Sequence, residues 1–260
     1  MSDAAAPLQQ QIIVRPAEDS ADFGVGVGLQ RTVWGYSEID TVPDQMFVVA
    51  KKTGGQVLLA FDGKRAVGFA LAFVALKETG AYLHSHMVGV LAEYRDRGVG
   101  RLLKLAQRQD ALTRRIDRIE WTFDPLQLKN ARFNIARLGT VVRHYLPNLY
   151  GRTSSPLHAG LPTDRLVAEW WLDSSRVRAR VGKPAARAAK KSTGKKKLAR
   201  IRIPGELAEF RCSQPEEAAG LQSEIRLEFE HWFGRGYAAT GIEIDTTGST
   251  YILESWKSDD

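Results

Sequence analysis

The sequence predicts an α/β protein with a mixed, mostly antiparallel sheet flanked by helices and a small α+β extension at its C-terminal end. Asp62-Gly63 separates two apolar runs over 57–61 and 66–74, which is typical of a tight hairpin because glycine accepts the positive φ of such a turn. Leucine and alanine then recur at spacings of three and four over 102–112, which predicts an amphipathic helix. A third apolar, strand-like run follows that helix over 119–123.

The remaining elements follow from the same local signals. Runs of β-branched and aromatic residues predict strands, and Gly139 and Gly234 are placed to end two helices. By alternation, His84, His86 and Val88 share one face of the strand over 82–90. We expect strands over 12–15, 57–61, 66–74, 82–90, 119–123, 167–172, 201–204, 237–244 and 251–253, and helices over 20–34, 102–112, 130–138 and 215–233.

The composition is typical of a folded globular protein. The chain has 260 residues, of which 43% are hydrophobic and 26% charged, and no run approaches the length of a membrane span. The first residues lack a basic region followed by an apolar core, so no secretory signal is expected. A single cysteine, Cys212, excludes an internal disulfide framework and a cysteine zinc cluster. Together these observations predict a cytoplasmic protein without a metal site.

The net charge of +7 is concentrated in one segment. Residues 174–200 contain eleven lysines and arginines and no acidic residue, so the remainder of the chain carries −4, the difference between +7 and +11. The segment lacks bulky periodic residues, which predicts a basic flexible linker or loop between a body over 12–173 and the extension over 201–260. A solvated linker is one interpretation, and weak, salt-dependent contact with nucleic acid is the other.

The segment from Val88 to Arg101 carries the strongest functional signal. It reads as a strand, a short loop and a helix that opens with glycines, a start that leaves backbone N–H groups without partners inside the helix. These donors and the positive end of the helix dipole favour a phosphate. Arg95, Arg97 and Arg101 oppose that dipole, and an anionic ligand would relieve the conflict.

Three glycine-rich patterns compete for this segment. The phosphate loop of nucleotide hydrolases requires G-x-x-x-x-G-K-[ST], which the chain lacks. The dinucleotide fingerprint requires a third glycine at position 103, where the chain has Leu103. The third pattern, [RQ]-x-x-G-x-[GA], is matched by Arg95-Asp96-Arg97-Gly98-Val99-Gly100.

On this turn and on the order of the elements around it, the sequence resembles the GCN5-related N-acetyltransferase (GNAT) family. The resemblance covers about residues 12–150. The run Trp121-Thr122-Phe123-Asp124-Pro125, with Asn130, Asn134 and Gly139, is similar to a poorly characterised bacterial branch of that family.

The resemblance implies acetyl-CoA, or another acyl-CoA, as co-substrate and an unknown amine acceptor that attacks the thioester directly. Val88, Gly89 and Val90 would bind the pantetheine arm, and the amide of Val88 or a neighbour would polarise the acyl carbonyl. Asn130 and Asn134 are expected to contact the coenzyme, with a helix cap or a satisfied buried amide as the alternative. The pyrophosphate would be held by the amides of Arg95, Asp96, Arg97, Gly98, Val99, Gly100 and Arg101.

The catalytic acid and base are less defined. Many family members place a tyrosine, as general acid, where this chain has Ile135, so Tyr145 or Tyr150 would have to replace it. Glu120 is the candidate base, with His84 and His86 on the neighbouring strand. Because Ile135 replaces the tyrosine of the family, a second interpretation stays open: a non-catalytic coenzyme A-binding or interaction module with a GNAT fold. The extension over 201–260 would pack on the body and shape the acceptor pocket, or mediate homodimer contacts.

Overall fold

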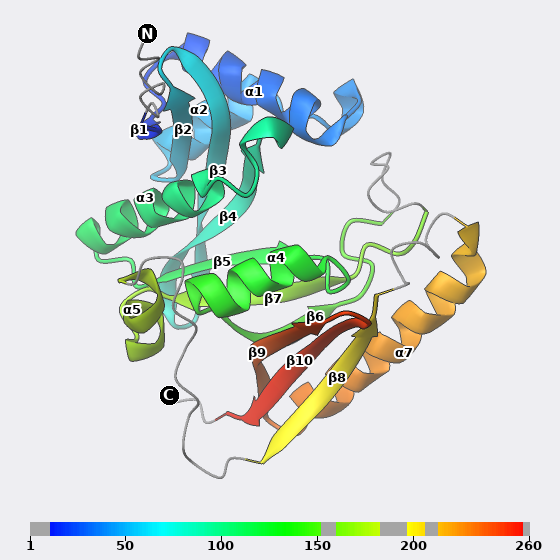
Figure 1. Cartoon of the computed structure of the whole chain (residues 1–260). Coiled ribbons are helices and arrows are strands. Elements are labelled where there is room, and N and C mark those ends of the chain that lie inside the picture. The colour runs from blue at the N-terminus through cyan, green and yellow to red at the C-terminus, as the bar shows by residue number, and fades with distance from the viewer. Residues whose placement is uncertain (1–10, 152–159, 183–196, 206–212, 257–260) are drawn as a thin grey trace, which may run out of the picture. The chain divides into compact units, whose positions relative to one another are not determined.

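The computed structural model describes residues 11–151, 160–182, 197–205 and 213–256 (Figure 1). The chain divides into two compact units. The first unit comprises Met1–Val74 and Ser85–Asp110, and the second comprises Ala75–His84 and Ala111–Asp260. Two strands, β3 and β4, contribute residues to both.

The first unit is built from a four-stranded sheet with helices. The strand order is β1-β2-β3-β4, and Gly63, at a φ of 58°, forms the expected hairpin between β2 and β3. Its elements are β1 (Ile13–Pro16), α1 (Ser20–Trp34), η1 (Glu38–Asp40), α2 (Asp44–Lys52), β2 (Gln56–Asp62), β3 (Arg65–Lys77), β4 (Gly80–Val90), η2 (Ala92–Tyr94) and α3 (Val99–Thr113).

Local chemistry explains where these helices begin and end. The side chain of Asp19 caps α1 by accepting the N–H of Asp22, and Gly35 ends the helix in the left-handed conformation. Helix α2 was not predicted from the sequence, and its buried face consists of Phe47 and Ala50 alone. A nine-residue helix with so few core contacts leaves little periodicity to detect.

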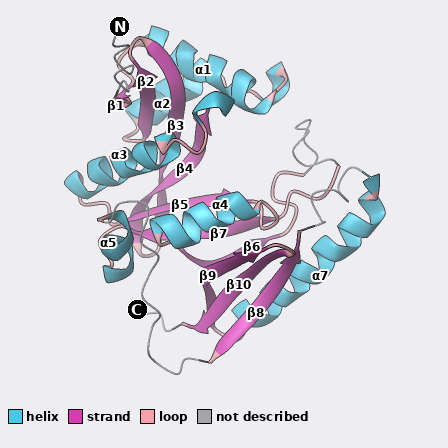
Figure 2. Ribbon diagram, in the orientation of Figure 1, coloured by secondary structure: helices cyan, strands magenta, loops and turns pink. Residues whose placement is uncertain are grey.

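The second unit continues the mixed sheet. Its strand order is β4-β5-β7-β6-β9-β10-β8, with β4 and β5 parallel and the other pairs antiparallel, which confirms the predicted fold class. Helix α7 packs against β6, β8 and β9 (Figure 2). The elements are β5 (Arg118–Phe123), α4 (Leu128–Arg132), the π-helical η3 (Phe133–Leu138), β6 (Val141–Leu146), β7 (Arg165–Trp171), α5 (Ser175–Val181), β8 (Leu198–Pro204), α7 (Pro215–Phe233), β9 (Tyr237–Asp245) and β10 (Gly248–Ser255).

The basic segment begins in folded structure. Helix α5 occupies its start, where Arg176 donates hydrogen bonds to the carbonyls of Gly139 and Thr240, and Arg180 donates one to the carbonyl of Ala136. Burial lowers the pKa of Arg176 to about 10. The expected loop or linker is therefore helical at this end, because its arginines cap carbonyls at the end of η3. Residues 183–196 lie outside the described residues, and at its other end the predicted linker already forms strand, since β8 begins at Leu198.

The C-terminal extension shares the core of the second unit. Val142 of β6 is the register partner of Ala239 of β9, and the ring of Phe229 on α7 packs against those of Tyr145 and Tyr251. Residues on both sides of the basic segment thus bury one another. No helix among the described residues is long and apolar enough to cross a membrane.

Candidate functional site

The turn that leads into α3 presents unused backbone donors. The first hydrogen bond of this helix runs from the N–H of Leu102 to the carbonyl of Gly98, at 3.0 Å. The amides of Val99 and Gly100 precede it and have no acceptor within the helix. None of the loop and turn hydrogen bonds between described residues uses them either. We call residues 95–101 the anion cradle.

The space beside the cradle is open. Gly98 has a φ of 85°, and a Cβ built on it would meet no atom within 4 Å. A Cβ on Gly100 would meet only the side chain of Val90, at 3.9 Å. Asp96 also takes a positive φ, of 59°, so the turn depends on two left-handed residues. An anion could therefore approach the backbone of Gly98 and Gly100 closely.

The three arginines of the cradle do different things. The guanidinium of Arg95 donates to the carbonyls of Val90 and Val33, both at 3.3 Å, and so ties the loop to the ends of β4 and α1. Arg97 is exposed and lies over the ring of Tyr94, 5.0 Å from its centroid. Arg101 is half-buried in the first turn of α3. All three keep positive charge at the start of this helix.

The end of β4 has one free edge within the first unit. The register pairs that join β4 to β5 are Leu83↔Ile119 and His84↔Glu120, which stop before residues 85–90. Gly89 packs so tightly that a Cβ would come within 2.7 Å of the Phe69 ring. The expected pantetheine residues Val88, Gly89 and Val90 therefore lie on a strand whose backbone is joined to β3 alone at this end.

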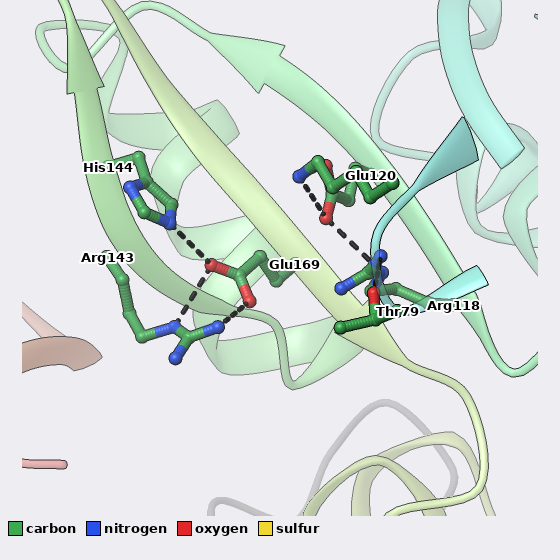
Figure 3. Close-up of polar contacts among 7 residues, drawn as sticks. Thr79, Arg118, Glu120, Arg143, His144 and Glu169 are labelled. Atoms are coloured by element: carbon green, nitrogen blue, oxygen red, sulfur yellow. Dashed lines mark hydrogen bonds and ion pairs between the residues drawn. The ribbon is translucent and has the colours of Figure 1, made fainter. Parts of the chain in front are cut away.

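The second unit contains a cavity of about 440 Å³, which we call the ionic cavity (Figure 3). Every residue that lines it is polar or charged, which favours a ligand with polar groups. The lining residues are Lys77, Glu78, Thr79, Arg118, Glu120, Arg143, His144 and Glu169.

Glu120 is held firmly in this cavity. It is 3% exposed, and Nζ of Lys77 lies 2.9 and 2.7 Å from its two carboxylate oxygens. Nε of Arg118 lies 3.3 Å from Oε1. Arg118 is in turn fixed between the rings of Tyr82 and Trp171, 5.0 and 4.9 Å from their centroids. Two cations and two aromatic rings thus determine where this carboxylate lies.

Glu169, which sequence reasoning missed, is the second buried carboxylate of the cavity. It is 2% exposed, and Arg143 binds it bidentately, with Nε 3.1 Å from Oε1 and Nη2 2.6 Å from Oε2. Nε2 of His144 lies 3.7 Å from Oε1 (Figure 3). A lone acidic residue in the middle of the apolar run 167–172 was the available signal, since buried strand positions rarely hold an unpaired carboxylate.

A β-bulge delivers both partners to Glu169. The register of β6 against β7 passes from Val142↔Ala168 to Tyr145↔Leu166, so β6 contains one extra residue there. The bulge lets the consecutive residues Arg143 and His144 both line the ionic cavity, which strict alternation would forbid.

Comparison with known proteins identifies the region around the cradle. Residues 29–139 match the family model of the acetyltransferase (GNAT) family. Residues 29–139 are a GNAT domain. A search of the curated proteins found no match.

Two solved structures with TM-scores of at least 0.50 agree with this GNAT domain in fold. An acetyltransferase of the GNAT family from Desulfovibrio desulfuricans is 14% identical with a TM-score of 0.51, covering 62% of this chain and 99% of that one. The NatC complex bound to Gag peptide and CoA is 12% identical with a TM-score of 0.50, covering 61% and 97%. Arabidopsis thaliana Naa50, in complex with a bisubstrate analogue, is 17% identical with a TM-score of 0.49, covering 61% and 97%.

The two asparagines expected at the coenzyme differ in their surroundings. Asn134 is buried, accepts a hydrogen bond from the indole of Trp121 at 3.3 Å, and donates to Oδ1 of Asn130 at 3.4 Å. This arrangement is that of a satisfied buried amide. Asn130 is exposed. Contact of either residue with coenzyme stays a prediction.

The candidate tyrosines lie in different places. The hydroxyl of Tyr145 donates to Asp164 at 2.6 Å, and burial together with that hydrogen bond raises the pKa of Tyr145. Tyr145 does not line the ionic cavity, so the structure does not bring it to Glu120. The hydroxyl of Tyr150 lies 3.1 Å from that of Thr122, which shares a face of β5 with Glu120. Ile135 is fully buried.

The face of the ionic cavity is opposite the one that α4 and η3 cover. Trp121 bonds Asn134 of η3, and the indole of Trp170 donates to the carbonyl of Leu138 at 2.9 Å. Because neighbours alternate along a strand, Glu120 and Glu169 point to the other side. Of the candidate histidines, His84 is the register partner of Glu120, and His86 is exposed beside Phe73. Among the described residues, no group of three or more His, Cys, Asp or Glu could hold a metal ion.

Proposed function

We propose that this protein is an N-acyltransferase that moves an acetyl or other acyl group from acyl-CoA to an amine. The observation that carries the proposal is the anion cradle, with its unused amides of Val99 and Gly100 inside the matched GNAT domain. The NatC structure, which shares the fold, is described as bound to CoA, and this supports the choice of coenzyme.

In this proposal the cradle and β4 bind different parts of the coenzyme. The diphosphate binds the amides of residues 95–101, where the helix dipole and the charges of Arg97 and Arg101 stabilise it. The pantetheine arm adds to the free edge of β4 along Val88, Gly89 and Val90. The thioester supplies the activated acyl group, and an amide near Val88 stabilises the negative charge that develops on its oxygen.

The acceptor in this proposal is an amine. Within the second unit, the polar lining of the ionic cavity and the negative charge of Glu120 favour a polar amine in its ammonium form. The amine attacks the thioester directly, so no nucleophilic side chain is required. Tyr150 is the better candidate to protonate the departing thiolate, because the hydroxyl of Tyr145 is already engaged by Asp164. The identity of the amine stays open.

Calorimetric titration with coenzyme A tests the first step. Wild type should bind coenzyme A and acetyl-CoA, and Gly98→Leu should lose binding because its side chain would occupy the open space above the cradle. Gly35→Leu is the matched control, since Gly35 also has a positive φ and open surroundings in the same unit. Both variants carry a similar backbone strain of about 1–2 kcal/mol. Equal binding by the two variants, or none by wild type, would contradict the proposal.

A second candidate, a non-catalytic coenzyme A-binding module, is favoured by one observation. Ile135 is buried where many relatives would present a tyrosine, and Tyr145 is committed to Asp164. If acetyl-CoA binds but no amine from a broad panel accelerates thiol release, this function replaces the first.

We also propose weak nucleic-acid contact and a homodimer. Of the eleven basic residues over 174–200, Arg176 and Arg180 bind carbonyls, and Arg178 and Arg200 pair with Asp173 and Glu243. Weak nucleic-acid contact therefore depends chiefly on 183–196, and deletion of that segment should reduce the salt dependence of DNA binding. Light scattering tests the homodimer. The cytoplasmic location stays a prediction, and Cys212 lies outside the described residues.

A further inference from the structure

The ionic cavity exposes its basic side chains and buries two of its carboxylates. All of the residues that line it belong to the second unit. The side chains of Lys77, Arg143 and His144 are 44%, 28% and 58% exposed. Those of Glu120 and Glu169 are 5% and 2% exposed. A ligand that enters the cavity therefore meets the basic groups, because the two carboxylates are covered.

These basic groups keep donors that the protein does not use. Arg143 binds Glu169 through Nε and Nη2, and its Nη1 makes no hydrogen bond with a described residue (Figure 3). Nε2 of His144 lies 3.7 Å from Oε1 of Glu169, which is too far for a hydrogen bond. Nζ of Lys77 has three donors and directs two of them at Glu120. The spare donors favour an anion, and a guanidinium matches the oxygens of a carboxylate.

The charges of the lining also favour an anion. Lys77, Arg118 and Arg143 carry three positive charges. The buried Glu120 and Glu169 carry two negative charges, so the five side chains sum to +1, the difference between +3 and +2 in magnitude. Both carboxylates are already paired with cations. A carboxylate of the ligand would neutralise the remaining charge, which favours its binding over that of a neutral molecule.

The third acidic residue of the lining, Glu78, differs from the other two. It is exposed, and its carboxylate forms no hydrogen bond or ion pair with a described residue. Glu120 attracts cations as well, but Lys77 covers both of its oxygens. A cationic group of a ligand can therefore reach Glu78 without displacing a side chain. One cavity of about 440 Å³ thus offers donors to an anion and a carboxylate to an ammonium group.

We propose that the ionic cavity is a binding site for a small zwitterion, a free α-amino acid. Its carboxylate binds Arg143 and Lys77, and its ammonium group binds Glu78. The wholly polar lining favours an amino acid with a polar side chain. This inference goes beyond the proposed acyl transfer, since the second unit alone forms the site and binding requires no coenzyme.

Calorimetric titration of the full-length chain with the common amino acids, one at a time and without coenzyme, tests the site. At least one polar amino acid should bind. Its N-acetyl derivative lacks the ammonium group and its amide derivative lacks the carboxylate, so each should bind at least about tenfold more weakly. The inference is overturned if no amino acid binds, or if either derivative binds as tightly as the parent amino acid.

Two substitutions locate the binding. Glu78→Gln should weaken it at least about tenfold, and Glu224→Gln, on an exposed glutamate of α7 that does not line the cavity, should keep the wild-type affinity. Arg143→Lys keeps a positive charge beside Glu169 but removes the guanidinium, and it should weaken binding by a similar factor. Circular dichroism checks its fold, and if it does not fold, Glu78→Gln decides. Unchanged affinity in Glu78→Gln, or an equal loss in Glu224→Gln, would place the ligand elsewhere and refute the site.

The two proposals fail in distinguishable ways. If an amino acid binds but coenzyme A does not, the acyl transfer is refuted and the zwitterion site stands. If coenzyme A binds and no amino acid does, the zwitterion site is refuted and the acyl transfer stands.

Discussion

Glu120 of β5 and Glu169 of β7 are directly opposed register partners, and both carboxylates are buried. Like charges at such a position repel one another. Each carboxylate is therefore held by its own arginine, Glu120 by Arg118 and Glu169 by Arg143. The paired glutamates give the cavity two fixed negative charges.

Removal of Arg143 should destabilise the second unit. Arg143→Met leaves the buried carboxylate of Glu169 without its bidentate partner, and we expect a loss of about 1–3 kcal/mol in the free energy of unfolding. Arg178→Met is the matched control, since the pair of Arg178 with Asp173 is exposed and should contribute less than about 1 kcal/mol. Urea denaturation measures both, and equal losses would contradict the burial argument.

Substitution of Tyr145 should lower stability, whereas substitution of Tyr150 should lower activity. Tyr145→Phe removes the hydrogen bond to Asp164 and should cost about 1–3 kcal/mol of stability with little change in the rate of thiol release. Tyr150→Phe should leave stability nearly unchanged, because its ring is exposed, and slow thiol release by about 10²-fold. If Tyr145→Phe slows thiol release and Tyr150→Phe does not, Tyr145 and not Tyr150 protonates the thiolate.

Lys104 should make the first unit more stable as the pH rises. It is buried within α3, donates to the hydroxyl of Ser85 at 2.9 Å, and desolvation lowers its pKa well below 10.5. The pKa of this amine is lower in the folded chain than in the unfolded chain. As the pH falls below the pKa of the unfolded chain, the unfolded state takes up a proton that the folded state does not, and the free energy of unfolding decreases until the pKa of the folded chain is reached. The protection factors for hydrogen exchange in α3 and β4, which are corrected for the intrinsic exchange rate, should therefore rise between pH 7 and 10. Lys104→Met should remove this extra dependence.

Asp22 should make the stability of the first unit depend on pH in the acidic range. The hydrogen bonds from Arg15 and then the N–H of Glu18 lower the pKa of Asp22 below 3.8. Its contribution to stability is complete above about pH 4 and is lost as the pH falls through the lower folded value. Asp22→Asn should flatten the acid limb of the unfolding curve, measured by circular dichroism. Asp44→Asn, on an exposed carboxyl in the same unit, is the control and should leave the limb as in wild type.

Local patterns predicted most elements because their causes are local. The hairpin at Gly63, the cap at Gly139 and the helix over 215–233 depend on residues adjacent in the chain, and all are confirmed. The strand β6 was missed because residues 141–146 mix polar and apolar side chains around a bulge. The helix α5 was missed because its arginines are stabilised by carbonyls of η3 and of β9, which lie far away in the sequence.

The sequence by itself determined the cradle, since a helix start that opens with glycines and arginines places amide donors and positive charge together whatever surrounds it. Only the tertiary structure decided the composition of the ionic cavity. Glu120, Glu169 and His144 come from three strands, and their meeting depends on the register of β5 with β7 and on the extra residue in β6. Register follows from the packing of whole strands, so the immediate neighbours of these residues carry no trace of it.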